Sequence, residues 1–280
     1  MLRYLQSLFS KPENAVENIC LTPAQEAVQN TQVPIVSVIA RAGTGKTATM
    51  VAKAQRILKN PQNKVLFLSF SKAAANEVHR RLKQKSELKE RFLSSTFHSF
   101  AFQCLTNASC PQIMLNDGLT FSLQNMHLLN ENRRQNFLDY FAARQCQDLH
   151  LPGDWQKTLS LNLNHHSLQE NGLVKLLDSY LIYQKMWPRL IKFYSENACL
   201  DFDFLILLFE QALMNDPSFF SEFSPQFTHL IVDEFQDCNQ SQMHILKMIY
   251  HCPSIQQVTA VGDPLQTLYD WRGASPKNFE

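Results

Sequence analysis

Short apolar runs alternate along the chain with segments in which apolar residues recur three or four positions apart. The runs at 35–39, 230–232 and 258–261 are rich in β-branched residues, which is typical of buried parallel strands. The segment that starts at Lys46 carries Ala, Met, Val and Leu at helical spacing. Strands that alternate with helices predict an α/β fold in which helices flank a parallel sheet.

The middle of the chain has a different pattern. The stretches NMHLLNENRRQNFLDYFAARQCQDLH and NGLVKLLDSYLIYQKMWPRLIKFYSEN place apolar residues at helical spacing among Asn, Gln and Lys, which predicts amphipathic helices. Pro and Gly in NASCPQIMLNDG and LPGD are typical of linkers. We therefore predict an all-helical subdomain over 105–198, inserted into a discontinuous domain made of 1–104 and 199–280.

The turn ARAGTGKT lies between the first predicted strand and its helix, as a phosphate-binding loop requires. Gly43 and Gly45 allow backbone conformations in which consecutive N–H groups point at a phosphate. The predicted nucleotide-binding residues are Ala42, Gly43, Thr44, Gly45, Lys46 and Thr47. Lys46 is expected to reach the β- and γ-phosphates, and the Thr47 hydroxyl is expected to bind Mg²⁺.

Two acids follow the second predicted strand in FTHLIVDEFQDC. The carboxyl ends of parallel strands are where doubly wound sheets bind ligands. We therefore expect Asp233 to hold Mg²⁺ together with Thr47, and Glu234 to act as the base toward the water that attacks the γ-phosphate.

A third strand and turn lie in IQQVTAVGDPLQTLYDWRGAS. Gln266 comes just after the turn, where its amide could contact the γ-phosphate. Tyr269, Trp271 and Arg272 suit stacking on bases and pairing with a phosphate, although both aromatic residues could equally belong to the core.

The amino-acid composition indicates a globular protein but does not indicate its function. A content of 45% hydrophobic and 11% aromatic residues is enough for a packed core, and a net charge of +1 is no general signature of nucleic-acid binding. Basic residues nevertheless gather in HRRLKQKSELKER, which is either a solvated helix face or a nucleic-acid patch. The seven cysteines show no zinc spacing, and no run approaches membrane-spanning length. We expect reduced thiols, no membrane contact and a cytoplasmic location.

A set of stretches, taken in order, resembles the UvrD/Rep/PcrA-like DNA helicases, superfamily 1 motors that move 3′ to 5′ on single-stranded DNA. They are LTPAQEAV, ARAGTGKT, LSFSKAAANEV, STFHSFA, LDFDFLILLFEQAL, VDEFQDCNQSQ and VGDPLQTLYDWRGA. The resemblance implies a RecA-like ATP-binding domain, and the small helical subdomain of that family corresponds to the predicted insertion.

The resemblance also implies roles for individual residues. Gln25 would read the adenine edge of ATP, and Gln236 would couple the ATP and DNA sites. Gln266 would contact the γ-phosphate. The DNA-binding residues implied are Phe70, Thr96, His98, Tyr269, Trp271 and Arg272.

These features predict the motor half of a UvrD-like helicase that binds ATP, Mg²⁺ and single-stranded DNA. The chain ends at Glu280, just after the last motif, so it is either a shortened gene product or a fragment whose other RecA-like lobe lies on a second polypeptide, and we expect slow turnover without that lobe. The alternative is a degenerate helicase remnant that binds nucleotide or protein without unwinding DNA. A phosphate-loop kinase or GTPase is disfavoured because no acceptor-site or guanine-reading motif accompanies the turn.

Overall fold

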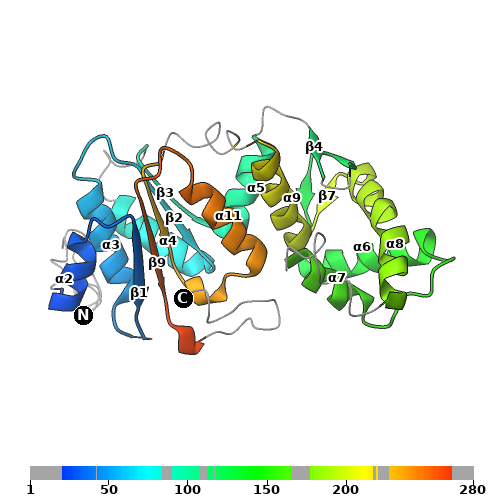
Figure 1. Ribbon diagram of the computed structural model, residues 1–280, viewed down its shortest axis with the longest axis horizontal. Coiled ribbons are helices and arrows are strands. Elements are labelled where there is room, and N and C mark those ends of the chain that lie inside the picture. The colour runs from blue at the N-terminus through cyan, green and yellow to red at the C-terminus, as the bar shows by residue number, and fades with distance from the viewer. Residues whose placement is uncertain are drawn as a thin grey trace, which may run out of the picture.

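A five-stranded, entirely parallel sheet organises the two outer parts of the chain (Figure 1). The computed structural model describes residues 21–41, 43–83, 90–107, 112–115, 118–164, 177–216, 219 and 227–266. The sheet order is β1 (Ile35–Ile39), β9 (Gln257–Gly262), β8 (His229–Val232), β2 (Val65–Ser69) and β3 (Phe92–Thr96). The predicted fold class, a parallel sheet flanked by helices, is confirmed.

Helices cover both faces of the sheet, and the alternation of side chains along the strands explains how. In β2, Val65 and Phe67 pack with α3 (Lys46–Ile57) and α4 (Lys72–Lys83). Leu66 and Leu68 point to the opposite face, which is covered by α5 (Phe97–Thr106), α9 (Phe202–Asn215) and α11 (Gln240–Tyr250). Both faces of this central strand are buried, which accounts for its apolar residues at 65–68.

Residues that follow the strands meet at one edge of the sheet because all the strands run in the same direction. The last residue of β1, Ile39, pairs with the last residue of β9, Gly262. In the same way, Leu68 near the end of β2 pairs with Val232 at the end of β8. Short 3₁₀ turns follow β8 (Phe235–Asp237) and β9 (Pro264–Gln266). The phosphate loop and the acids after β8 are therefore brought to the same edge.

Polar caps define where the helices begin. The Thr96 side chain accepts a hydrogen bond from the Ser99 N–H at the start of α5, and Asp201 does the same for Phe204 in α9. Asn239 and Gln242 form a reciprocal capping box at the start of α11. These caps satisfy N–H groups that have no partner within the helix, so the loops at the sheet edge end at defined residues.

The inserted segment is mostly helical, as predicted, with α6 (Glu131–Gln145), α7 (Trp155–Asn164) and α8 (Leu177–Glu196). It also contains strands that the hydrophobic pattern did not predict. β4 (Gln112–Met114) pairs with β5 (Thr120–Ser122), and β6 (His127–Leu128) pairs with β7 (Cys199–Leu200). Strands of two or three residues are too short for alternation to be visible in a sequence.

Both proposed domain boundaries are crossed by continuous structure. α5 runs through residue 104 to Thr106, and β7, just after residue 198, pairs with β6 of the insertion. α9 packs against α5 and α11 of the sheet domain and also against α7 of the insertion. The sheet domain and the insertion therefore share a core. The boundaries at 104/105 and 198/199 remain a proposal.

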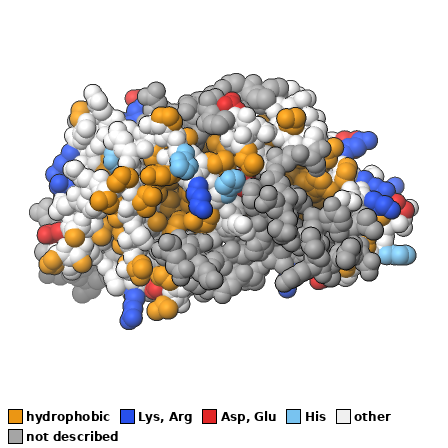
Figure 2. Space-filling view, viewed as in Figure 1, with side chains coloured by type: hydrophobic (Ala, Val, Ile, Leu, Met, Phe, Trp, Pro, Cys, Tyr) orange, Lys and Arg blue, Asp and Glu red, His pale blue; other side chains and the backbone are white. Residues whose placement is uncertain are grey.

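β1 forms one end of the sheet, and apolar residues within it and just before it are exposed. Val33, Ile35 and Ile39 are 53%, 59% and 66% exposed. Figure 2 shows hydrophobic side chains gathered over the half of the molecule that carries the sheet. Among the described residues β1 has a strand partner on one side only, and an end strand with exposed apolar side chains is a surface on which further protein can pack.

The described cysteines are buried thiols, and none of them forms a disulfide. Burial raises the pKa of the Cys104 thiol to about 12, so this residue is a poor nucleophile. Within the described part of the chain, every helix is too short or too polar to cross a membrane.

Candidate functional site

The phosphate loop adopts a conformation that depends on its glycines. Gly43 and Gly45 have φ of +76° and +83°, a region that favours glycine. A Cβ on Gly45 would also lie 2.9 Å from Gln25 Nε2. The Thr44 hydroxyl donates to the Arg41 carbonyl at 2.7 Å and closes the turn. Ala42, also predicted to bind nucleotide, lies outside the described residues.

Lys46 and Glu234 meet across the sheet edge. Lys46 is the first residue of α3, and its Nζ lies 3.3 Å from Glu234 Oε2. The Lys46 side chain is 12% exposed and that of Glu234 is 32% exposed. Glu234 has φ of +51°, which is unusual for a residue with a side chain. The backbone after β8 therefore turns sharply, and its carboxylate faces the start of α3.

Asp233 has the properties of a ligand for a hard cation. It is 3% exposed, and its Oδ1 has no hydrogen-bond partner among the described residues. Burial, followed by the nearby Glu234 carboxylate, raises the pKa of Asp233 to about 6. A buried carboxylate oxygen without a donor fits Mg²⁺, which prefers oxygen ligands and would offset that desolvation. Thr47, the other predicted ligand, lies in the first turn of α3.

A chain of hydrogen bonds connects Glu234 to the end of β9. Gln236 Nε2 donates to Glu234 Oε2 at 2.8 Å, and Gln236 Oε1 accepts from the Asp263 N–H at 2.9 Å. Gln266 Nε2 donates to Asp263 Oδ2 at 2.7 Å. The Gln266 amide, predicted to contact the γ-phosphate, is thus held by Asp263. Asp263 was not among the predicted site residues.

Gln25 lies beside the phosphate loop, as its predicted role requires, but its amide has two protein partners. Its Nε2 donates to the Thr44 carbonyl at 2.9 Å, and its Oε1 accepts from the Thr22 N–H at 2.9 Å. The second bond belongs to the capping box of α2 (Pro23–Asn30). In this conformation Gln25 links the loop to α2.

The predicted DNA-binding residues follow β2 and β3 at the same sheet edge. The Phe70 ring stacks on Phe97 at 6.4 Å between centroids. Thr96 caps α5, and the His98 ring lies edge-on to Phe202 at 5.2 Å. Phe202 is 38% exposed. It is an additional candidate that the sequence reasoning missed, although an apolar residue next to the cap of α9 was a signal.

Three predicted DNA-binding residues, Tyr269, Trp271 and Arg272, lie outside the described residues. The basic run is described only in part. Within it, Arg80 and Arg81 each contact Glu77, at 2.9 and 2.7 Å. Exposed pairs of this kind favour a solvated helix face as much as a nucleic-acid patch, so both interpretations remain.

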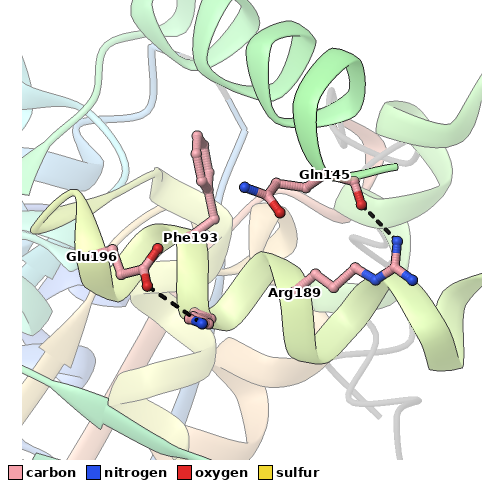
Figure 3. A pocket seen from close by; sticks show the side chains of 5 residues that line it. Gln145, Arg189, Phe193 and Glu196 are labelled. Carbon is pink, nitrogen blue, oxygen red and sulfur yellow. Dashed lines mark hydrogen bonds and ion pairs between the residues drawn. The ribbon is translucent and has the colours of Figure 1, made fainter. Parts of the chain in front are cut away.

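A separate pocket of about 230 Å³ lies on the insertion, away from the phosphate loop (Figures 1 and 3). Its lining is made of Gln145, Arg189, Lys192, Phe193 and Glu196. Arg189 donates to the Gln145 carbonyl and pairs with Asp148, and Lys192 lies 3.6 Å from Glu196. Each charged side chain that lines the pocket therefore has an ion-pair partner among the described residues.

The chain is similar in sequence to several bacterial DNA helicases. The ATP-dependent DNA helicase PcrA of Staphylococcus aureus is 28% identical over 283 residues, covering 95% of this chain and 36% of PcrA. Rep of Buchnera aphidicola is 27% identical, covering 86% of this chain and 36% of Rep. A probable DNA helicase II homolog of Mycoplasma genitalium is 30% identical, covering 83% and 34%.

The chain spans about a third of the length of these relatives. Residues 21–280 match the family described as the UvrD/REP helicase N-terminal domain. This match covers the phosphate loop, the acids after β8 and both parts of the sheet. The chain belongs to the UvrD/REP helicase N-terminal domain family.

Proposed function

We propose that the chain is the ATP-binding and ATP-hydrolysing motor half of a DNA helicase that acts on single-stranded DNA. One observation carries the proposal. Lys46 of the phosphate loop and Glu234 after β8 are 188 positions apart in sequence, yet their charged atoms lie 3.3 Å apart. The names of its relatives, ATP-dependent DNA helicases, support the same function.

Each of these residues has a separate role in phosphoryl transfer. The ammonium of Lys46 and the N–H groups of the loop stabilise negative charge on the phosphates. Glu234 accepts a proton from the attacking water as the water oxygen bonds to the γ-phosphorus and the bond to ADP breaks. Mg²⁺, when bound, would neutralise phosphate charge, and Asp233 and Thr47 would hold it.

The hydrogen-bond chain from Glu234 to Gln266 offers a way to couple this site to DNA. Gln236 contacts both the proposed base and the backbone at the end of β9. The segment after Gln266 carries Tyr269, Trp271 and Arg272, which we propose contact DNA together with Phe70, Thr96 and His98. Loss of the γ-phosphate would then be transmitted through Gln236 and Gln266 to the strand. Movement from 3′ to 5′ is part of the proposal.

Translocation requires a second RecA-like lobe, which we propose is supplied by further polypeptide. The exposed apolar positions of β1 give such a partner a surface on which to pack. The second lobe would contribute the arginines that stabilise the transferred phosphoryl group, an effect of about 10³- to 10⁵-fold in rate. We place this activity in the cytoplasm, where ATP, Mg²⁺ and DNA are available.

Single-strand-stimulated ATPase activity tests the proposal. The purified chain is assayed with Mg²⁺-ATP in the presence and absence of a single-stranded oligonucleotide, and ATP binding is measured in parallel. Stimulation by DNA that disappears in Glu234→Gln supports a motor half. Binding of ATP with no hydrolysis under any condition, including addition of fractionated cell extract, would instead support a nucleotide-binding remnant.

A further inference from the structure

The helix that carries Gln25 next to the phosphate loop is held by very little apolar packing. α2 has eight residues, and none of its side chains is fully buried. Val28 is only partly buried against the smaller apolar cluster. Helices this short are unstable on their own, so the position of α2 depends on its contact with α3 and on hydrogen bonds at its two ends.

The N-terminal end of α2 is fixed to the nucleotide site. Gln25 Oε1 completes the capping box with Thr22, and Gln25 Nε2 donates to the Thr44 carbonyl. The close fit between Gln25 and Gly45, where a Cβ would lie 2.9 Å from the amide nitrogen, leaves little room for displacement. A shift of α2 along its axis would therefore break the contact with the loop.

The C-terminal end of α2 is held by a buried lysine. Lys53 is 1% exposed, and its Nζ donates to the Val28 carbonyl at 3.0 Å and to the Thr31 carbonyl at 3.4 Å. The last carbonyls of a helix have no partner within it and carry partial negative charge. An ammonium group satisfies them and complements that charge.

Two glutamines support the same end. Gln29 Nε2 donates to the Ala52 carbonyl of α3 at 3.2 Å. Gln257, at the start of β9, donates to the Thr31 and Val33 carbonyls at 3.3 and 2.7 Å. The end of α2 is therefore connected by hydrogen bonds to the helix that begins at Lys46 and to the strand that ends beside Asp263.

Burial of Lys53 has an electrostatic cost that no acid offsets. Among the described residues, Lys53 has no carboxylate partner, its charged neighbour is Arg56, and the nearby His229 is neutral at pH 7. Burial, and next Arg56, lower the pKa of Lys53 to about 8. An apolar side chain at position 53 would avoid this cost. The hydrogen bonds from Lys53 to the carbonyls of Val28 and Thr31 therefore account for a lysine at this buried position.

We propose that Lys53 is a positioning residue for nucleotide recognition, which holds Gln25 against the phosphate loop by binding the C-terminal carbonyls of α2. The inference rests on the proposed ATP site. Lys53 itself does not reach the nucleotide, since its donors face the last turn of α2. Its loss is expected to weaken the contribution of Gln25 and leave Lys46, Asp233 and Glu234 in place.

The test compares Lys53→Met with Gln25→Ala at pH 7, where Lys53 keeps its proton. Titration calorimetry measures Mg²⁺-ATP, Mg²⁺-GTP and Mg²⁺-tripolyphosphate, the last of which has no base. Each variant should lose about tenfold in ATP affinity, a loss typical of one hydrogen bond, and should lose its preference for ATP over GTP. Tripolyphosphate affinity should change less than about twofold. The double variant should be no weaker than either single one.

Further variants separate positioning from folding. Lys59→Met removes an exposed lysine just after α3 and should leave all three affinities unchanged, while Lys53→Arg, which can still donate to carbonyls, should restore part of the ATP preference. If Lys53→Met does not fold, Gln29→Ala should give a smaller shift in the same direction. Equal losses for ATP and tripolyphosphate, additive losses in the double variant, or unchanged ATP affinity would each refute the positioning role. Failure of the unmodified chain to bind any of the three compounds would refute the ATP site instead.

Discussion

Lys46 Nζ lies 3.3 Å from Glu234 Oε2, so the proposed phosphate-binding lysine and the proposed catalytic base form an ion pair. A triphosphate at the loop offers Lys46 a partner of higher negative charge, and Glu234 would then be available to the attacking water. Before nucleotide binds, each of these two partly buried charges is therefore neutralised by the other. Gln236 also donates to the same Glu234 oxygen, so the carboxylate keeps one partner when Lys46 exchanges its own.

Replacing Lys46 by Ala should abolish nucleotide binding. The change removes the ammonium that contacts the phosphates, and charge-assisted hydrogen bonds contribute about 1.5–3 kcal/mol each. The loss of two such bonds should reduce ATP affinity by about 10²- to 10⁴-fold. Calorimetric titration with Mg²⁺-ATP measures the change, and Lys59→Ala is the control. Wild-type affinity in Lys46→Ala would contradict the assignment of the loop.

Glu234→Gln should separate binding from hydrolysis. The amide cannot accept the proton of the attacking water, and general bases contribute about 10²- to 10⁴-fold. ATP affinity should stay the same or increase slightly, because Lys46 no longer has a carboxylate partner. Single-turnover hydrolysis and ATP titration measure the two effects on the same protein. Equal hydrolysis by both proteins would mean that another base acts or that the activity is a contaminant.

The parts of the site that were predictable from sequence are those encoded locally. A β-branched run, a glycine turn and a helical segment lie next to one another around Lys46, and the strand before Asp233 is apolar at every position. Since parallel strands end at a common edge, these two segments could be predicted to meet. The long amphipathic helices of the insertion were predictable for the same reason, as their period extends over many residues.

Contacts that depend on packing were not predictable. Nothing near Lys53 in the sequence distinguishes it from exposed lysines, and its burial follows from how α2 lies on α3. The bond between Gln266 and Asp263 depends on the 3₁₀ turn after β9. The partial exposure of Phe202 against His98 depends on where α9 meets α5.

Phe202→Ala should weaken binding of single-stranded DNA without changing ATP affinity. Its ring is partly exposed beside His98, and stacking of a base on an aromatic ring contributes about 1–3 kcal/mol. We expect about a tenfold loss in oligonucleotide affinity by fluorescence anisotropy, and Phe202→Trp should retain most of the binding. Tyr140→Ala, an exposed aromatic residue of the insertion, is the control. Equal effects of Phe202→Ala and Tyr140→Ala would mean that neither ring is specific for DNA.

His229 should make the fold sensitive to acid. Burial, and next the nearby Lys53, lower the pKa of His229 to about 4, from an ordinary value of 6.5. The unfolded chain therefore binds a proton between these values while the folded protein does not, and stability is lost as the pH falls from 6.5 toward 4.

Urea unfolding measures this loss at pH 7 and at pH 4.5. His229→Asn should reduce the difference between the two free energies of unfolding by about 1–2 kcal/mol. The matched control is His150→Asn, which changes an exposed histidine. An identical pH dependence in His229→Asn and the unmodified chain would show that other groups dominate.

Breaking the buried ion pair between Arg134 and Asp201 should destabilise the junction of the insertion with α9. Arg134 Nε donates to Asp201 Oδ2 at 2.9 Å, and Asp201 is completely buried. Tyr194 donates to the same oxygen, and the Phe204 N–H donates to the other. Burial, and next Asp203, raise the pKa of Asp201, while Arg134 opposes this shift. Arg134 thus favours the ionised form of the buried Asp201 carboxyl group.

Arg134→Met should therefore lower the free energy of unfolding by about 3–5 kcal/mol, because it leaves a buried carboxylate without its cation. Arg133→Met, at the exposed neighbouring position, should have little effect. Adding Asp201→Asn to Arg134→Met should recover part of the loss, since the amide needs no counter-charge and can still cap α9. Urea unfolding of the three variants measures these differences. Equal stabilities of Arg134→Met and Arg133→Met would mean that apolar packing, rather than this pair, joins the insertion to the sheet domain.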